Sequence, residues 1–218
     1  LNSAEINPAL SGSYAVKPTI PVGITAIGMY VPPTVVKNSD FVNIHLLPHE
    51  EAFFGTDPHF AENLRRVAKD EHAMDMAVKA AKKAIEDYNI DPATIDLVLF
   101  TSSCKDLARL EPPIANYIQT SIGAINANSF NIDCGFNGWL PAITTGSAYI
   151  ASGYYKKVMV VTGETIVGSM DCSTSEALFM GDGAGAVLLE RVAEGDGLLS
   201  FHHMSKECVS AAGVRITG

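Results

Sequence analysis

Apolar and polar residues alternate along the chain in two different periods, which predict strands and helices in turn. Between residues 71 and 88 the apolar positions recur three and four apart, as in a helix with one buried face. The short continuous apolar run at 97–100 is typical of a strand covered on both faces. We expect further strands at 22–30, 129–132, 157–162, 183–190 and 198–203, and further helices at 112–122 and 138–151. This order favours a layered α/β domain with a mostly parallel sheet, and only residues 41–69 look irregular and partly helical.

The turn between an expected strand and an expected helix, FNIDCGFNGW at 130–139, is the strongest chemical signal in the chain. A side chain in such a turn lies over the first turn of the helix, where unpaired N–H groups favour an anion. A cysteine there has a lowered pKa and can act as a nucleophile. Cys134 is such a candidate, although a cysteine near a strand end is also commonly buried and unreactive.

The glycine-rich run GDGAGA at 181–186 resembles a phosphate-binding loop only superficially. A dinucleotide fingerprint needs a strand before it and a helix after it. Here the apolar residues VLLE that follow indicate a strand. We therefore expect these glycines to allow a tight turn and a close backbone approach.

Several segments together resemble the β-ketoacyl-acyl-carrier-protein synthase III family of the thiolase superfamily. The resemblance covers most of residues 21–190, in the family's order and near its spacing. Its segments are 22–42, 72–103, 112–124, 150–164 and LFMGDGAGAVLLE at 178–190. It implies the N-terminal half of a thiolase-like layered α/β/α fold, with the helix at 138–151 buried on several sides.

The same resemblance bears on the nucleophile. Aligned without a gap, Asn131 takes the position of the family's aspartate, and Gly138-Trp139 take that of its Gly-Phe pair. Phe136 then occupies the position of the nucleophilic cysteine. Placing Cys134 there instead needs a two-residue shift that loses the Gly-aromatic match. The nucleophile position is therefore taken by Phe136 in one register and by Cys134 in the other.

The implied chemistry is acyl transfer from coenzyme A or acyl-carrier-protein thioesters, followed by condensation with a malonyl thioester, with no further cofactor. A different class of function is a subunit without a nucleophile that supports an active paralogue. The family's second half, which carries its His and Asn, has no counterpart here. The family's arginine contact to coenzyme A from the loop before GDGAGA has no counterpart, because residues 165–181 contain no Arg or Lys. Arg65 and Arg66 resemble the family's basic motif after its first loop and are candidates for binding coenzyme A.

Two expectations concern assembly. Glu111 resembles the glutamate of head-to-head condensing relatives, which crosses a dimer interface as a base; a solvated turn carboxylate is the alternative. The family dimerises through an edge strand, and the apolar run at 157–162 is our candidate for that edge. We expect a homodimer, or a heterodimer with a related synthase.

Composition narrows the picture further. The net charge of −9 argues against nucleic acid or an anionic membrane as partner. Four widely spaced cysteines and the adjacent His202 and His203 offer no metal-ligand pattern. We see neither a leader nor a membrane-spanning run, and expect a cytoplasmic protein. Residues 1–20 are interpreted as a tail or linker and residues 21–218 as one domain.

Overall fold

The core of the protein is a five-stranded mixed sheet. The computed structural model describes residues 20–40, 64–104, 112–171 and 173–201, together with residues 48 and 51. The strands lie in the order β1, β7, β6, β4, β5. Their bounds are Val22–Tyr30 (β1), Gly183–Arg191 (β7), Lys157–Glu164 (β6), Leu97–Thr101 (β4) and Asn128–Asn131 (β5).

Four of the five strands run in the same direction, as expected for a mostly parallel sheet. β4 is parallel to both β5 and β6, whereas β7 is antiparallel to both β6 and β1. β7 is the exception, because it returns alongside β6 without a crossover helix, and it makes the sheet mixed. No continuous strand forms in the described part of the expected strand at 198–203: residues 198–200 have no regular structure and Phe201 makes only an isolated β-bridge. Residues 202 and 203 lie outside the described part of the chain.

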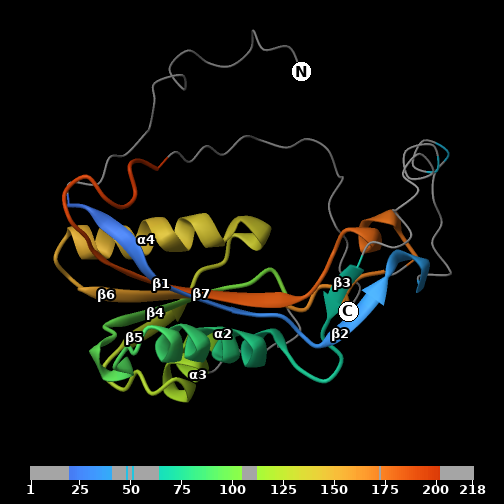
Figure 1. Ribbon diagram of the computed structural model, residues 1–218, viewed down its shortest axis with the longest axis horizontal. Helices are drawn as coiled ribbons and strands as arrows, with labels where there is room; N and C mark the ends of the chain where they lie inside the picture. The colour runs from blue at the N-terminus through green and yellow to red at the C-terminus, as the bar shows by residue number, and fades with distance from the viewer. Residues whose placement is uncertain are drawn as a thin grey trace, which may run out of the picture.

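Helices cover the two faces of this sheet unequally (Figure 1). α2 (Ala73–Asp87) and α3 (Ile114–Ser121) lie on one face, and α4 (Trp139–Ala151) lies on the other. α2 packs so closely that a Cβ on Gly28 of β1 would lie 2.1 Å from the carbonyl oxygen of Ala80. These layers confirm the expected helix–sheet–helix architecture.

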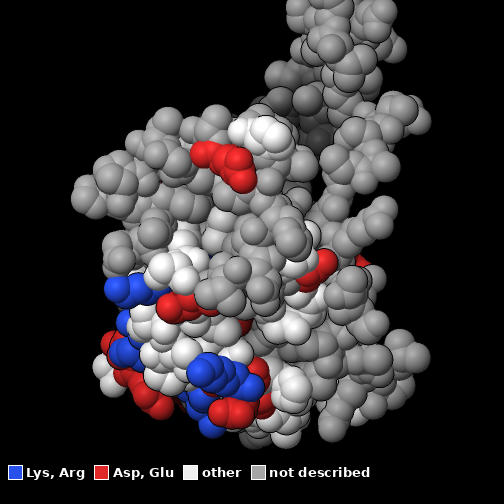
Figure 2. Space-filling model, turned by 90° about the vertical axis from the view of Figure 1, so that its right-hand side faces the viewer, with Lys and Arg blue, Asp and Glu red and all other residues white. Residues whose placement is uncertain are grey.

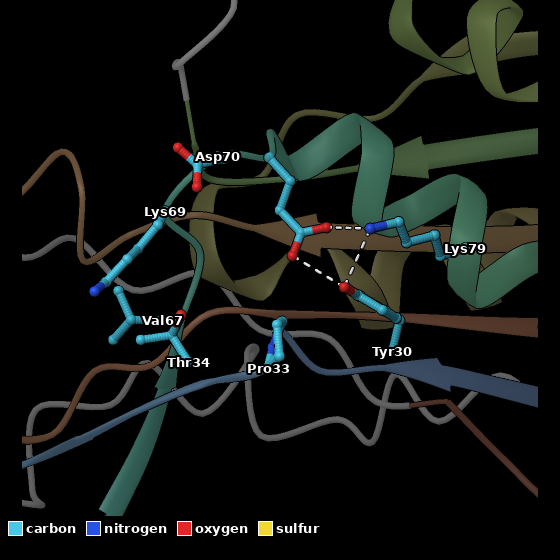
Figure 3. Close-up of a pocket in the computed structure, with 8 residues that line it drawn as sticks. Tyr30, Pro33, Thr34, Val67, Lys69, Asp70 and Lys79 are labelled. Carbon is cyan, nitrogen blue, oxygen red and sulfur yellow. Dashed lines mark hydrogen bonds and ion pairs between the residues drawn. The ribbon is translucent and has the colours of Figure 1, made fainter.

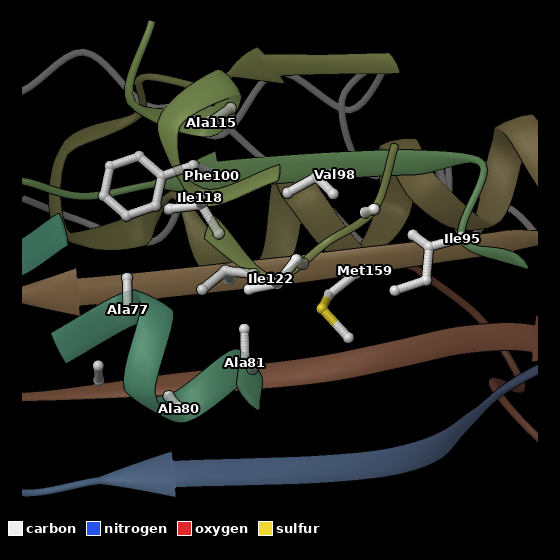
Figure 4. Close-up of a cluster of buried hydrophobic side chains, with 14 of the residues drawn as sticks. Ala77, Ala80, Ala81, Ile95, Val98, Phe100, Ala115, Ile118, Ile122 and Met159 are labelled. Atoms are coloured by element: carbon white, nitrogen blue, oxygen red, sulfur yellow. The ribbon is translucent and has the colours of Figure 1, made fainter. Parts of the chain in front are cut away.

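Each face of the sheet has its own apolar core. The core between the sheet and the helices α2 and α3 includes Met76, Val98, Phe100, Ile118 and Met159 (Figure 4). The core under α4 is built from alternate residues of the same strands, among them Leu97, Leu99, Val158 and Val160. Continuous apolar runs such as β4 thus serve both cores, as strands buried on both faces do.

The burial expected of α4 holds on one side only. Its Ala142, Ile143, Gly146 and Ile150 face the sheet and are buried. On the opposite side Leu140 is 55% exposed. In the described residues α4 is therefore packed on the sheet but not enclosed.

A two-stranded hairpin extends the molecule beyond the main sheet. It pairs β2 (Thr34–Lys37) with β3 (Leu64–Val67) in antiparallel register. The expectation of irregular or helical structure over 41–69 is wrong for β3; residues 41–47, 49–50 and 52–63 lie outside the described residues. Short 3-10 turns complete the fold at Asn38–Asp40, Pro92–Thr94, Gly135–Asn137 (η6) and Ser175–Leu178 (η7).

Strand order also settles which strand is the sheet's edge. β6 lies between β7 and β4, so the expectation that 157–162 forms an open edge is wrong. Its apolar residues are buried by neighbours on both sides and by both cores. Within the described chain the edge strands are β5 and β1, and β5 is the strand that leads into the turn at 130–139.

Candidate active site

The carboxyl ends of the three parallel strands meet at one edge of the sheet and bring together the turns that follow them. β5 ends at Asn131, and the chain passes through Asp133 and η6 before α4 begins at Trp139. We call residues 132–138 the elbow. The carboxylate of Asp133 accepts a hydrogen bond from Gly135 N at 3.3 Å, which closes the turn.

Both candidates for the nucleophile position lie in this elbow. Cys134 is exposed and directly precedes η6, while Phe136 lies within η6 and is 57% exposed. Gly135 between them has φ +55°, a left-handed conformation that suits glycine, and β5 has already ended at Asn131. Strand alternation therefore does not place Cys134 and Phe136 on the same side.

The elbow is packed against the end of β4. A Cβ on Gly138 would lie 1.8 Å from Thr101 Oγ1, so only glycine fits there. Thr101 is 2% exposed, and its hydroxyl has no hydrogen-bond partner among the described residues. The position of the α4 N-terminus is thus set by contact with β4.

Glu164, the last residue of β6, holds the turn that follows β4. Its Oε1 accepts a hydrogen bond from Ser103 N at 2.8 Å. Its Oε2 accepts from Ser103 Oγ at 2.7 Å, Cys104 Sγ at 3.0 Å and Ser102 Oγ at 3.3 Å. No sequence pattern points to Glu164, because its partners lie about 60 residues earlier in the chain.

Cys104 belongs to the same cluster and is not a candidate nucleophile. Its sulfur accepts a hydrogen bond from Thr165 N at 3.0 Å and donates to Glu164. Burial, followed by the hydrogen bond and charge of Glu164, raises the pKa of the Cys104 thiol to about 12. At neutral pH this thiol is protonated and therefore unreactive.

Asn131 connects the elbow to α3. Its side-chain oxygen accepts a hydrogen bond from Ala115 N at 2.9 Å, in the first turn of α3. Prolines precede this turn and offer no side-chain cap, so Asn131 supplies an acceptor from across the fold.

Arg65 and Asp182 tie the β2–β3 hairpin to the segment before β7. The Arg65 guanidinium donates to the carbonyl oxygens of Ala177 and Leu178, the latter at 2.6 Å. The buried Asp182 carboxylate accepts from Ala68 N at 2.8 Å and Val167 N at 3.0 Å. Asp182 lies in GDGAGA, where the sequence pointed to the glycines and missed the carboxylate.

The remaining candidates are not brought into the elbow by the described residues. Arg66 is exposed and donates to the carbonyl oxygen of Pro33 at 3.0 Å. Glu111 lies outside the described residues. The last four residues of GDGAGA already belong to β7, and no helix follows, as expected.

A separate pocket of about 270 Å³ lies where the hairpin joins the main sheet (Figure 3). Tyr30 OH donates to Glu71 at 3.0 Å, Lys79 donates to Tyr30 OH at 3.1 Å, and Lys79 forms an ion pair with Glu71. The hydrogen bond to Glu71 is the main cause of a raised pKa at Lys79. These groups satisfy one another, which indicates a structural cluster.

On the face that includes the hairpin, the described residues form no single-sign charged surface. Figure 2 shows acidic and basic side chains intermixed over the described part of this face. Among the described residues, no helix is long and apolar enough to cross a membrane. The described part of the chain also holds no group of His, Cys, Asp and Glu that could bind a metal ion.

Comparison with known proteins identifies the relatives of this fold. The family model for 3-oxoacyl-[acyl-carrier-protein] synthase III matches residues 130–207, which include the elbow. β-Ketoacyl-[acyl-carrier-protein] synthase III 1 of Bacillus cereus is 38% identical over 182 residues, which cover 83% of this chain and 57% of that protein.

Solved structures agree. The priming β-ketosynthase of the R1128 polyketide pathway superposes with a TM-score of 0.69 and 28% identity, covering 81% of this chain and 52% of that one. 3-Oxoacyl-[acyl-carrier-protein] synthase III of Aquifex aeolicus gives 0.68 and 28%, covering 79% and 55%.

The fold and the strand-end elbow place the chain among the thiolase-like layered α/β proteins. Within that class it is a relative of the β-ketoacyl-[acyl-carrier-protein] synthase III family. It spans little more than half the length of the relatives that it matches.

Proposed function

We propose that the protein containing this chain is a condensing protein of the synthase III type built for acyl thioesters, with Phe136 replacing the nucleophile. The observation that carries the proposal is the elbow over the α4 N-terminus, in a chain 38% identical to a β-ketoacyl-[acyl-carrier-protein] synthase III. The substrates would be acyl groups on coenzyme A or acyl carrier protein, and no further cofactor is required.

The side chain at Phe136 decides what this chain can do. A phenyl ring has no lone pair with which to attack a thioester, so this register gives a chain that cannot carry the acyl group itself. The exposed Cys134 precedes it by two residues, beyond a left-handed glycine. This favours Phe136 at the tip of the elbow and Cys134 beside it.

A second function follows from the same substitution. A chain with the fold but no nucleophile would support an active paralogue by forming part of its assembly. β5 favours this reading, because its outer edge is unpaired in the described chain and could extend its sheet into a partner. The proposed assembly is a homodimer or a heterodimer with a related synthase, joined through β5. The reading in which Glu111 acts as a base across that interface stays a prediction.

Further polypeptide is proposed to cover the open side of α4. On that face of the sheet Ile24, Ile27 and Met29 of β1 are exposed, and Met29 is 68% exposed. A contiguous apolar face of this kind is typical of a buried interface. We propose that it packs against a segment that supplies the remaining catalytic groups.

The test is acylation of the full-length protein by acyl-CoA, followed by intact-mass and peptide mass spectrometry. We expect Phe136→Cys to gain a thioester adduct on residue 136, and Cys134→Ala to behave like the unmodified protein. Cys134→Ala combined with Phe136→Cys is the matched control, and should retain the adduct. An adduct on Cys134 in the natural sequence that disappears in Cys134→Ala would make Cys134 the nucleophile and overturn this register.

A further inference from the structure

Glu164 connects two strand ends that both border the elbow. It ends β6, and its carboxylate accepts hydrogen bonds from three consecutive residues of the turn after β4, Ser102 to Cys104. Thr165 N donates back to Cys104 Sγ at 3.0 Å, and Cys104 N donates to Ser102 Oγ at 3.0 Å. The turn is therefore fixed to β6 at several points.

That turn begins directly after Thr101, the residue on which the elbow rests. Thr101 pairs with Thr162 of β6 in the parallel register, two residues before Glu164. Gly138 leaves no space above Thr101 Oγ1. A contiguous set of contacts thus runs from Glu164 through the 102–104 turn and Thr101 to Gly138 at the start of α4.

A direct chemical role for Glu164 is less consistent with its contacts. Four donors are directed at this carboxylate, three at Oε2 and one at Oε1. An ionised carboxylate has about four acceptor positions, so most of its hydrogen-bonding capacity is used within the protein. Its contacts suit holding a turn in place.

We propose that Glu164 is a positioning residue, which fixes the elbow over the α4 N-terminus by holding the 102–104 turn under it. The inference rests on the proposed function for its catalytic consequence, but its structural consequence is independent of any activity. Loss of the carboxylate leaves several donors without an acceptor, so the turn relaxes and Thr101 no longer supports Gly138 in one position.

Trp139 reports on the elbow directly. It is the single tryptophan of the 218-residue chain and the first residue of α4, next to Gly138. We expect Glu164→Gln to raise the acrylamide quenching constant of Trp139 about twofold in the folded protein, well below its melting temperature. A role confined to overall stability would not change this constant in folded protein.

Glu190→Gln is the matched control. Glu190 is also a partly buried strand glutamate and accepts a hydrogen bond from Thr25 Oγ1 at 2.6 Å, but it pairs with Lys157 at the opposite end of β6. It should leave Trp139 quenching unchanged. If Glu164→Gln does not fold, Ser103→Ala removes one donor of the cluster and should give a smaller change in the same direction.

The catalytic arm uses the full-length Phe136→Cys protein. There we expect Glu164→Gln to lower the rate of acylation on the order of tenfold and to change KM less than about twofold, because orientation and not binding is lost. If Phe136→Cys accepts no acyl group, the proposed function fails and Trp139 quenching alone decides this inference. Unchanged quenching in folded Glu164→Gln, or a changed quenching with an unchanged acylation rate, overturns it.

Discussion

Gly138 lies so close to Thr101 that a Cβ on Gly138 would lie 1.8 Å from Thr101 Oγ1 and 3.1 Å from Thr101 Cβ. The two residues are 37 positions apart in the sequence and belong to different elements, β4 and the elbow. Gly138 has an ordinary helical φ of −59°, so the need for glycine is one of space and not of backbone conformation.

Gly138→Ala is therefore expected to destabilise the protein by about 3 kcal/mol, because an added methyl group would overlap a buried hydroxyl. Urea unfolding followed by circular dichroism measures the change. Gly135→Ala is the control: no described atom lies within 4 Å of its Cβ position, and only its left-handed φ is unfavourable, at about 1 kcal/mol.

Thr101→Ala should partly restore Gly138→Ala, since it removes the atom nearest to the new Cβ. A double-mutant cycle gives this coupling directly. If the stability losses of Thr101→Ala and Gly138→Ala simply add in the double variant, the contact between the two residues is not the cause of the destabilisation.

The two described cysteines should differ strongly in reactivity. Cys134 is exposed, whereas Cys104 is buried with its pKa raised to about 12. Peptide-resolved alkylation of the folded protein at pH 8 should label Cys134 at least about a hundredfold faster than Cys104. Similar rates for both would contradict the buried thiol–carboxylate contact with Glu164.

The Cys104 thiol is also expected to make the protein less stable at high pH. The folded state holds the Cys104 proton more tightly than the unfolded state, whose thiol has the ordinary pKa of 9.0. This contribution to stability is constant below about pH 9 and is lost as the pH rises towards 12. Chemical denaturation between pH 8 and 11 should show a fall in stability, and Cys104→Ala should reduce the slope.

Asp182→Asn should cost about 2 kcal/mol, because the buried carboxylate accepts two backbone N–H groups and an amide can accept only one of them. Thermal unfolding measures the loss. Asp91→Asn is a suitable control: Asp91 is an exposed cap that accepts from Ala93 N at 3.0 Å, and asparagine caps as well as aspartate.

Ser129→Pro tests the proposed dimer. Asn128 N and Ile132 N donate to the backbone of the β4 side of the sheet, so the N–H of Ser129 points to the open edge of β5. Proline at position 129 has no N–H to donate to a partner subunit, while the pairing of β5 with β4 is kept. We therefore expect light scattering to report a monomer in place of a dimer. Ser129→Ala should remain dimeric. A dimer that survives Ser129→Pro would place the interface elsewhere.

Local periods in the sequence were sufficient for most elements. The strand at 22–30 and the helix that was expected over 138–151 appear as β1 and α4 with nearly the same bounds. These segments have strong patterns because their residues face one core or two. The hairpin was missed because β2 and β3 are four residues each and separated by 26 residues, so neither has a long pattern of its own.

The sequence by itself determined the layered α/β class and the position of the elbow between a strand and a helix, because these depend on neighbouring residues and short periods. The resemblance to the synthase III family added the thiolase-like fold and Phe136 as the competitor of Cys134 for the tip of the elbow. Only the tertiary structure decided that β6 is interior and β5 is an edge, and that β7 runs antiparallel. Only it brought Glu164 to the 102–104 turn and Thr101 to Gly138. Those relationships join residues tens of positions apart, and their geometry follows from how the whole sheet packs and not from any local pattern.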